Sequence, residues 1–182
     1  MEGLAWLSRR QLDGGIDRVP LPAGVRGALF VCGKHAIGRD HEAALAEVRG
    51  VTGHDPVVVC LVEPHELRGR YDAYVEWLDA AGPAAVCWPV PDLHAPPVET
   101  MLPFVDDLAR RVCGGEALLI HCAGGIGRTG TTAVCLLMRL GVPRAEAEQI
   151  VALARPGAGP EVGAQREIVD AVAPLGPCEG VA

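Results

Sequence analysis

The stretch "LLIHCAGGIGRTGTTAV", residues 118–134, decides the fold of this chain and carries most of its chemistry. An apolar run ends at His121 and Cys122, three glycines follow, and Arg128 opens a segment typical of a helix. Because glycine lets the backbone curl without side-chain clashes, the pattern predicts a strand, a tight loop and a helix start. Such a loop turns several N–H groups inward beside the positive end of a helix, which makes an anion-binding site.

Short apolar runs alternate with helix-like segments on both sides of this stretch. Buried strands are expected at 27–32, 57–61, 84–88 and 117–121, with an edge strand near 16–22. Helices are expected at 39–50, 71–82, 98–112, 127–140, 144–154 and 161–172. The alternation predicts an α/β fold, with a central, mostly parallel sheet of four to five strands and helices on both faces.

The ends of these elements carry further expectations. Thr100 is expected to cap the third helix, which would put Pro103 in its first turn. Residues 1–12 and 176–182 are expected to be loose ends. With 182 residues and no long linker, the chain is expected to form a single domain over 1–182.

Composition narrows the class of partner. The chain has 16 basic and 23 acidic residues, a net charge of −7, which argues against nucleic acid or an anionic membrane as the main partner. No run approaches the roughly 18 apolar residues of a membrane span, and the first residues lack the apolar core of a signal peptide. Seven scattered cysteines, with no C-x-x-C, fit free thiols in a reducing cytosol rather than a zinc site. We therefore expect a soluble, cytoplasmic protein without metal or cofactor.

The loop also predicts a nucleophile. Cys122 would lie at the floor of the anion site, where the helix end and Arg128 favour the thiolate form of a thiol. Arg128 would hold a tetrahedral oxyanion with a two-pronged contact. A bound phosphorus would then lie in line with the sulfur, so a phosphocysteine intermediate is expected. Thr129 would hydrogen-bond the sulfur as it leaves, and His121 would orient the loop through its ring N–H.

A leaving alkoxide or phenoxide needs a proton, so a general acid is expected on a neighbouring loop. The segment "CWPVPDLHAPP", residues 87–97, follows an expected strand, and Asp92 is its only acidic residue. If that strand and the strand before Cys122 end on the same side of the sheet, Asp92 would hang over the thiol. A solvated turn aspartate is the alternative interpretation of Asp92.

These residues resemble the cysteine-dependent protein tyrosine phosphatases, and within them the small dual-specificity branch of the kinase-associated phosphatase type. The match to H-C-x5-R-[ST] covers the signature 121–130, and "WPVPD" is similar to that branch's acid loop. The resemblance implies a dual-specificity phosphatase-like fold, no cofactor, and catalysis by Cys122, Arg128, Asp92 and Thr129. It assigns phosphate binding to Arg128 and to the backbone of five loop residues: Ala123, Gly124, Gly125, Ile126 and Gly127.

Two further residues are implied by the same resemblance. Gln165 resembles a glutamine that places water in related enzymes, although a solvent-facing helical glutamine is an equal alternative. Cys60, in "VVVCLVEPHEL", resembles a second cysteine that stands behind the catalytic one, and it is hypothesised to form a reversible disulfide with Cys122. The alternative for Cys60 is an ordinary core cysteine.

The resemblance implies a phosphoprotein or phosphopeptide substrate, phosphotyrosine above all, with phosphoserine and phosphothreonine also considered. A phosphoinositide or another small phosphate monoester is the alternative, which the absence of lysine from the loop disfavours. Nothing in the sequence fixes the oligomeric state.

A dinucleotide-binding protein is the more remote alternative, because Gly125, Gly127 and Gly130 also spell G-x-G-x-x-G between a strand and a helix. That fold needs an acidic residue at the end of a second strand about 20 positions on, where this chain is expected to be helical.

Overall fold

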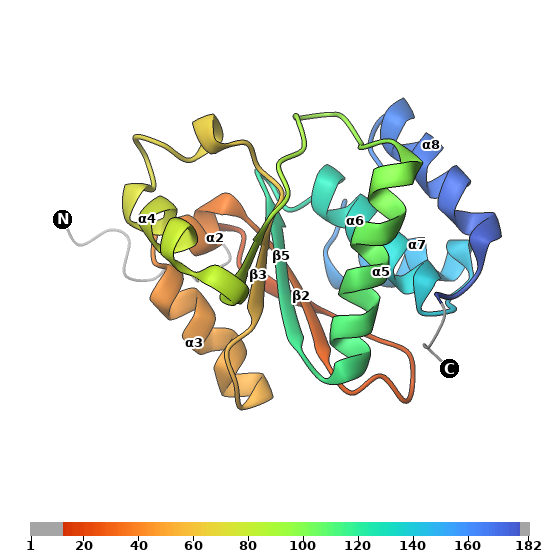
Figure 1. Cartoon of the computed structure of the whole chain (residues 1–182), viewed down its shortest axis with the longest axis horizontal. Helices are drawn as coiled ribbons and strands as arrows, with labels where there is room; N and C mark the ends of the chain where they lie inside the picture. The colour runs from red at the N-terminus through yellow and green to blue at the C-terminus, as the bar shows by residue number, and fades with distance from the viewer. Residues whose placement is uncertain (1–12, 179–182) are drawn as a thin grey trace.

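A computed structural model of the chain describes residues 13–178, which build one five-stranded sheet between two layers of helices (Figure 1). The strands run in the order β1-β2-β5-β3-β4 across the sheet. Their bounds are β1 Ile16–Val19, β2 Ala28–Gly33, β3 Val57–Cys60, β4 Ala85–Cys87 and β5 Ala117–Cys122. β2 pairs in parallel with β5, β5 with β3, and β3 with β4, whereas β1 pairs antiparallel with β2. The expected α/β class with a mostly parallel sheet is therefore confirmed.

The helices divide between the two faces of the sheet. One layer holds α2 Lys34–Gly38, α3 His41–Thr52 and α4 Asp72–Ala80. The other holds α5 Val98–Gly114, α6 Gly127–Arg139, α7 Arg144–Ala154 and α8 Gly163–Val172 (Figure 1). Within the described residues no helix is both long and apolar enough to cross a membrane.

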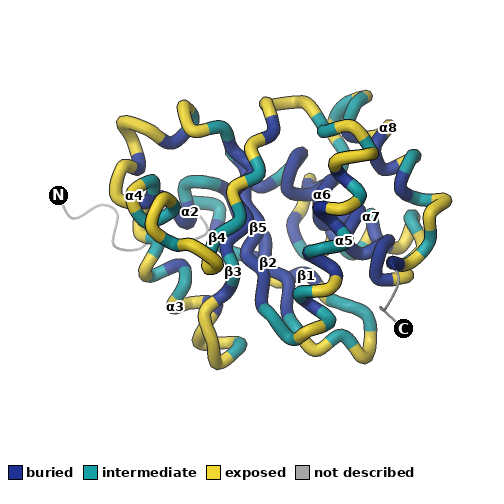
Figure 2. The backbone as a smooth tube through the Cα atoms, in the orientation of Figure 1, coloured by how far each residue is buried: buried dark blue, intermediate teal, exposed yellow. Residues whose placement is uncertain are grey.

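The core runs along the middle of the sheet. Every residue of β2 and of β5 is buried, as expected for continuous apolar strands covered on both faces. All of α6 is buried as well, because it lies under α5, α7 and α8 (Figure 2). The loop that joins β5 to α6 is therefore flanked on both sides by fully buried elements.

Two expectations about element ends are wrong, and one short helix was not expected. Lys34–Gly38 forms the short helix α2 directly after β2, where no helix was expected. α5 starts at Val98, so Pro103 lies inside it and Thr100 does not cap it. Residues 176–178 are not loose, because the Cys178 N–H donates to the Arg139 carbonyl at 2.9 Å and Cys178 is buried. Residues 1–12 lie outside the described part of the chain.

Candidate active site

The loop between β5 and α6 has its carbonyls anchored away from its centre. The carbonyl of Ala123 accepts from the Lys34 N–H at 3.1 Å, that of Gly124 from the Arg155 guanidinium at 2.8 Å, and that of Ile126 from the Gly130 N–H at 2.8 Å. In a trans peptide the C=O and the following N–H point in opposite directions. Each anchored carbonyl therefore turns the next N–H toward the concave side of the loop, as an oxyanion cradle requires.

Gly125 is required by the shape of this loop. Its φ is +73°, in the left-handed region, and an added Cβ would lie 2.4 Å from the Cys32 carbonyl oxygen. Any side chain at this position would push the loop away from β2, so the glycine follows from close packing as well as from backbone conformation.

Arg128 lies at the start of α6 and is held by a residue that the sequence did not single out. Its side chain bonds Glu66 in a fork, Nη1 to Oε1 at 2.7 Å and Nη2 to Oε2 at 3.0 Å, and Nη1 also donates to the Val90 carbonyl at 2.8 Å. Burial alone would raise the pKa of Glu66, but hydrogen bonds from Arg128 and the Glu63 N–H hold that pKa below its ordinary value. Glu66 therefore stays ionised and fixes the guanidinium.

Cys122 and Arg128 lie close together at the floor of the site. Burial acts to lower the pKa of Arg128, whereas Glu66, Cys122 and Asp92 act to raise it, and the net shift is upward. Cys122 is 3% exposed, as is Arg128. Both side chains are thus enclosed where β5 ends and α6 begins.

Asp92 reaches the same guanidinium from the acid loop. Its Oδ1 lies 3.1 Å from Nη2 of Arg128, while 70% of its side chain stays exposed to solvent. The loop around it is held down by the Val90 N–H, which donates to the Leu61 carbonyl at 3.0 Å, and by the Val90 carbonyl's bond to Arg128. The structure thus places Asp92 at the mouth of the cradle rather than in an isolated turn.

One nitrogen of Arg128 is left without a partner. Nε is buried and has no hydrogen bond within the described residues, although both Nη atoms are fully engaged. Thr129 is in the same condition: its Oγ1 is buried and unpartnered, so the expected bond to the Cys122 sulfur is not formed in this structure. Among the described residues, Nδ1 of His121 and Nε of Arg155 are buried and unpartnered as well, so four such atoms lie in or next to this loop, although buried polar groups are nearly always paired.

Lys34 is a second residue that the sequence analysis missed. Its N–H anchors Ala123, and its Nζ lies 3.7 Å from Oε2 of Glu66. A signal for both residues was present, because each comes at or soon after the carboxyl end of a strand adjacent to β5, the edge where the loop lies.

His121 lies behind the loop. It is fully buried, and its Nε2 lies 2.7 Å from the Tyr74 hydroxyl oxygen. Burial is the main cause that lowers the pKa of His121 to about 4, so the ring is neutral at physiological pH. A neutral, enclosed ring fits a structural role better than proton transfer.

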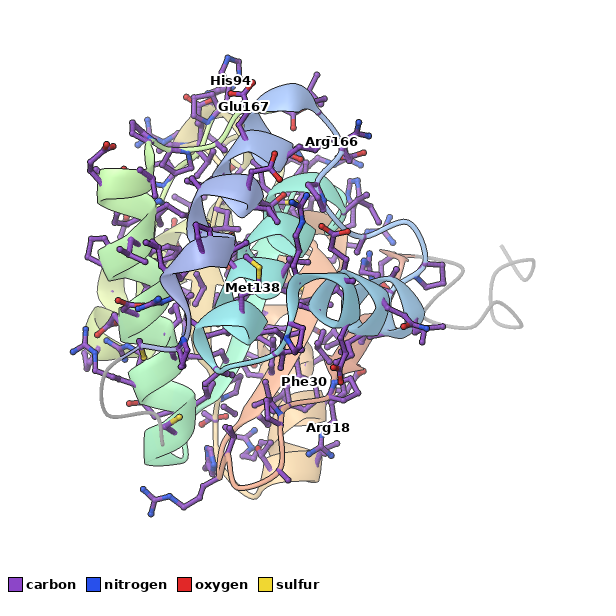
Figure 3. The ribbon with its side chains drawn as sticks, turned by 90° about the vertical axis from the view of Figure 1, so that its right-hand side faces the viewer. Arg18, Phe30, His94, Met138, Arg166 and Glu167 are labelled. Carbon is purple, nitrogen blue, oxygen red and sulfur yellow. The ribbon has the colours of Figure 1, made fainter. Side chains whose placement is uncertain are left out.

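Gln165 is brought to the site by α8. It is 1% exposed, its Oε1 accepts from the Glu161 N–H at 2.9 Å, and its Nε2 donates to the His94 carbonyl at 3.4 Å. Figure 3 labels His94 on the acid loop and Glu167 on α8 toward the same end of the molecule, and the Gln165 bond joins these two segments there. The solvent-facing alternative for Gln165 is therefore wrong, and the side chain ties α8 to the acid loop.

Cys60 lies next to another thiol. In the sheet it pairs with Cys87 on β4 and with His121 on β5. A hydrogen bond with Cys87, followed by burial, raises the pKa of Cys60, and the same bond lowers the pKa of Cys87 to about 7. Cys60 is buried and Cys87 is exposed, so the two thiols differ in access as well as in acidity.

Comparison with known proteins finds a family match over most of the chain. The model of the family described as "Swiss Army Knife protein, DSP-PTPase phosphatase domain" matches residues 28–170. The structure of Tk-PTP in its active form is 32% identical, with a TM-score of 0.62, over 87% of this chain and 97% of that one. The search of curated proteins returned no match.

Two more distant structures share the fold. Kinase associated phosphatase, with its catalytic-site cysteine replaced by serine, is 18% identical with a TM-score of 0.65, over 87% of this chain and 95% of its own. PTPMT1 in complex with PI(5)P is 18% identical with a TM-score of 0.62, over 81% of this chain and 90% of its own.

Proposed function

Because this chain belongs to the Swiss Army Knife family of DSP-PTPase phosphatase domains, we propose that it hydrolyses phosphotyrosine in proteins or peptides, with phosphoserine and phosphothreonine as further substrates. The family and the likeness to Tk-PTP make the chain a cysteine-dependent phosphatase. Its substrate and the role of each residue are the proposal.

The proposed reaction has two displacements at phosphorus. The Cys122 thiolate attacks the phosphoryl group, the loop N–H groups from Ala123 to Arg128 and the guanidinium hold its oxygens, and Asp92 protonates the departing oxygen. Water then attacks the phosphocysteine and the sulfur leaves, assisted by a hydrogen bond from Thr129. Gln165 orients that water. No step calls for a metal or a cofactor.

The unpartnered Nε of Arg128 is the observation that carries this proposal. Glu66 and Asp92 occupy the Nη atoms, so the remaining N–H is a buried, fixed donor beside Cys122. A tetrahedral oxyanion in the cradle would satisfy it.

Phosphoinositides form the second candidate substrate class. PTPMT1, with a related fold, was crystallised in complex with PI(5)P, and in this chain Lys34 adds a positive charge near Glu66 and the cradle. The loop itself contains no lysine, which keeps a phosphoprotein ahead. A purified-protein assay against phosphotyrosine peptides, phosphoserine and phosphothreonine peptides, phosphoinositides and nucleotides decides between the classes by relative kcat/KM.

The assignment of nucleophile and acid is tested with two variants. Cys122→Ser should abolish hydrolysis of p-nitrophenyl phosphate and still bind orthovanadate. Asp92→Asn should slow an alkyl phosphate, a poor leaving group, far more than p-nitrophenyl phosphate, because only the poor leaving group needs the proton. Wild-type activity in both variants would overturn the assignment.

The remaining expectations stay proposals. We propose that the chain acts in the cytoplasm as one phosphatase domain, 1–182, with acid loop 87–97.

We also propose that peroxide oxidises Cys122 to a sulfenic acid and that the Cys60 thiol displaces water from it to give a disulfide. Peptide mapping after mild peroxide treatment tests this: a Cys122 sulfinic acid with Cys60 still reduced would end the idea.

A further inference from the structure

Arg155, at the end of α7, lies in a buried ion pair with the first strand. Its Nη1 is 2.8 Å from Oδ2 of Asp17, and the side chains are 8% and 6% exposed. The same nitrogen donates to the carbonyls of Gly14 and Gly15, at 3.1 and 3.4 Å. Burying two charges costs several kcal/mol of desolvation per ion, so stability alone is a weak reason to keep such a pair.

The other terminal nitrogen of Arg155 reaches the phosphate-binding loop. Nη2 donates to the Gly124 carbonyl at 2.8 Å. The loop carbonyls of Ala123 and Ile126 accept from backbone N–H groups instead. The Gly124 carbonyl differs from these two, because its hydrogen-bond donor is a side chain.

The peptide between Gly124 and Gly125 is also the one that turns over most easily. A glycine on each side leaves both flanking dihedrals with little steric restriction, so this unit can rotate its C=O inward at small cost. That rotation would replace an N–H donor in the cradle by a carbonyl oxygen, which repels a phosphate. A carbonyl held outward by a charged donor prevents it.

We propose that Arg155 is a positioning residue for the phosphatase reaction, which holds the Gly124 carbonyl outward and so keeps the Gly125 N–H in the oxyanion cradle. Asp17 orients Arg155 and neutralises it, which gives β1 a part in catalysis. The inference rests on the proposed function, because it presumes that the cradle binds phosphate.

The test compares Arg155→Met, Arg155→Lys and Asp17→Asn with a matched control, Arg139→Met. Arg139 also forms an enclosed ion pair, with Asp106 at 2.6 Å, but it anchors residues 175 and 176 instead of the loop. Arg155→Met should lower kcat/KM for p-nitrophenyl phosphate roughly 100-fold, the effect of losing one oxyanion donor, and should weaken orthovanadate binding about 10-fold or more. Arg139→Met should lose stability to urea and keep vanadate affinity within about twofold.

The milder variants keep the test valid if Arg155→Met does not fold. Arg155→Lys retains the positive charge beside Asp17 but lacks the second nitrogen that bonds the Gly124 carbonyl. Its affinity for vanadate should therefore be lower than that of the wild type. In the wild-type protein, vanadate should shift the Gly125 amide signal in a ¹⁵N spectrum, and that shift should shrink in Arg155→Lys and Asp17→Asn.

The outcomes separate the two proposals. If the wild type hydrolyses phosphate esters and binds vanadate while the Arg155 variants match Arg139→Met, the positioning role is wrong and the phosphatase assignment stands. If the wild type neither hydrolyses nor binds these oxyanions, the proposed function fails and the positioning role falls with it.

Discussion

At the scale of single residues, the candidate site contains a guanidinium that is held by a carboxylate and a backbone carbonyl. Glu66 holds Arg128 through two hydrogen bonds and leaves Nε without a partner, which is the donor that we propose for the substrate. The sequence identified Arg128 through the signature, but Glu66 belongs to no local motif and is recognised only when β3 and β5 are seen side by side. Packing decides which side chain from a distant segment contacts Arg128, and a local sequence pattern does not report packing.

Glu66→Gln tests this anchor. The amide cannot offer two acceptor oxygens to the fork, so Arg128 should lose its fixed orientation, and kcat/KM for p-nitrophenyl phosphate should fall about 10- to 100-fold. Steady-state kinetics at constant pH measures the effect. Glu148→Gln, which breaks the surface pair with Arg144, is the control and should behave as wild type. Equal kinetics in the two variants would show that Arg128 needs no anchor.

His121 gives a pH prediction with a defined sign. Its pKa falls from an ordinary 6.5 to about 4 in the fold because the ring is buried, so between these values the unfolded chain takes up a proton that the native state does not. The stability from neutral His121 is thus complete above pH 6.5 and declines as pH falls toward 4. Urea unfolding should show a loss of about 2 kcal/mol from this group between pH 7 and pH 5.

The His121→Gln variant separates this contribution from those of other groups. It should flatten the decline in unfolding free energy between pH 7 and pH 5, whereas His54→Gln at an exposed position should keep the wild-type slope. An unchanged slope in His121→Gln would mean that some other group controls the acid sensitivity.

At the scale of elements, sequence periodicity predicted every strand and the longer helices, because continuous apolar runs and 3.6-residue patterns reflect burial directly. It failed where neighbouring elements decide the outcome. α2 begins at Lys34, immediately after β2 ends at Gly33, and α5 accommodates Pro103 in its interior. A residue such as Thr100 favours a helix start at its own position, but this local preference does not decide where α5 begins.

The loop as an element makes a prediction about Gly125. Gly125→Ala would put a methyl 2.4 Å from the Cys32 carbonyl oxygen and hold a side chain at φ +73°, so the loop should move away from β2. Vanadate binding and kcat/KM should both be lost almost completely. Gly50→Ala is the control: it lies in α3 with nothing within 4 Å of the added Cβ, so activity should not change. An active Gly125→Ala protein would contradict the described loop conformation.

At the scale of the whole molecule, the site is built from segments between Asp17 and Gln165. The last described residues contact the C-terminal end of α6, the end opposite the site. Arg139, at the end of the buried helix α6, pairs with Asp106 on α5 and donates to the Leu175 and Gly176 carbonyls, while the Cys178 N–H returns a bond to the Arg139 carbonyl. From the sequence, residues 176–182 are expected to be a loose end. The hydrogen bonds with Arg139, which is distant in the sequence, hold residues 175–178 in place.

A chain that ends at Leu175 should therefore fold but be less stable. It loses the Gly176 and Cys178 bonds to Arg139, which should lower the free energy of unfolding by about 1–3 kcal/mol. Because these contacts lie at the C-terminal end of α6 and the cradle lies at its N-terminal end, kcat/KM measured well below the melting temperature should stay at the wild-type value. A chain that ends at Cys178 is the reference, so that the difference in unfolding free energy between the two chains reports on residues 176–178 alone. If the chain that ends at Leu175 kept full stability, residues 176–178 would have no part in holding α6. If it folded but lost activity, these residues would have a direct part in the site.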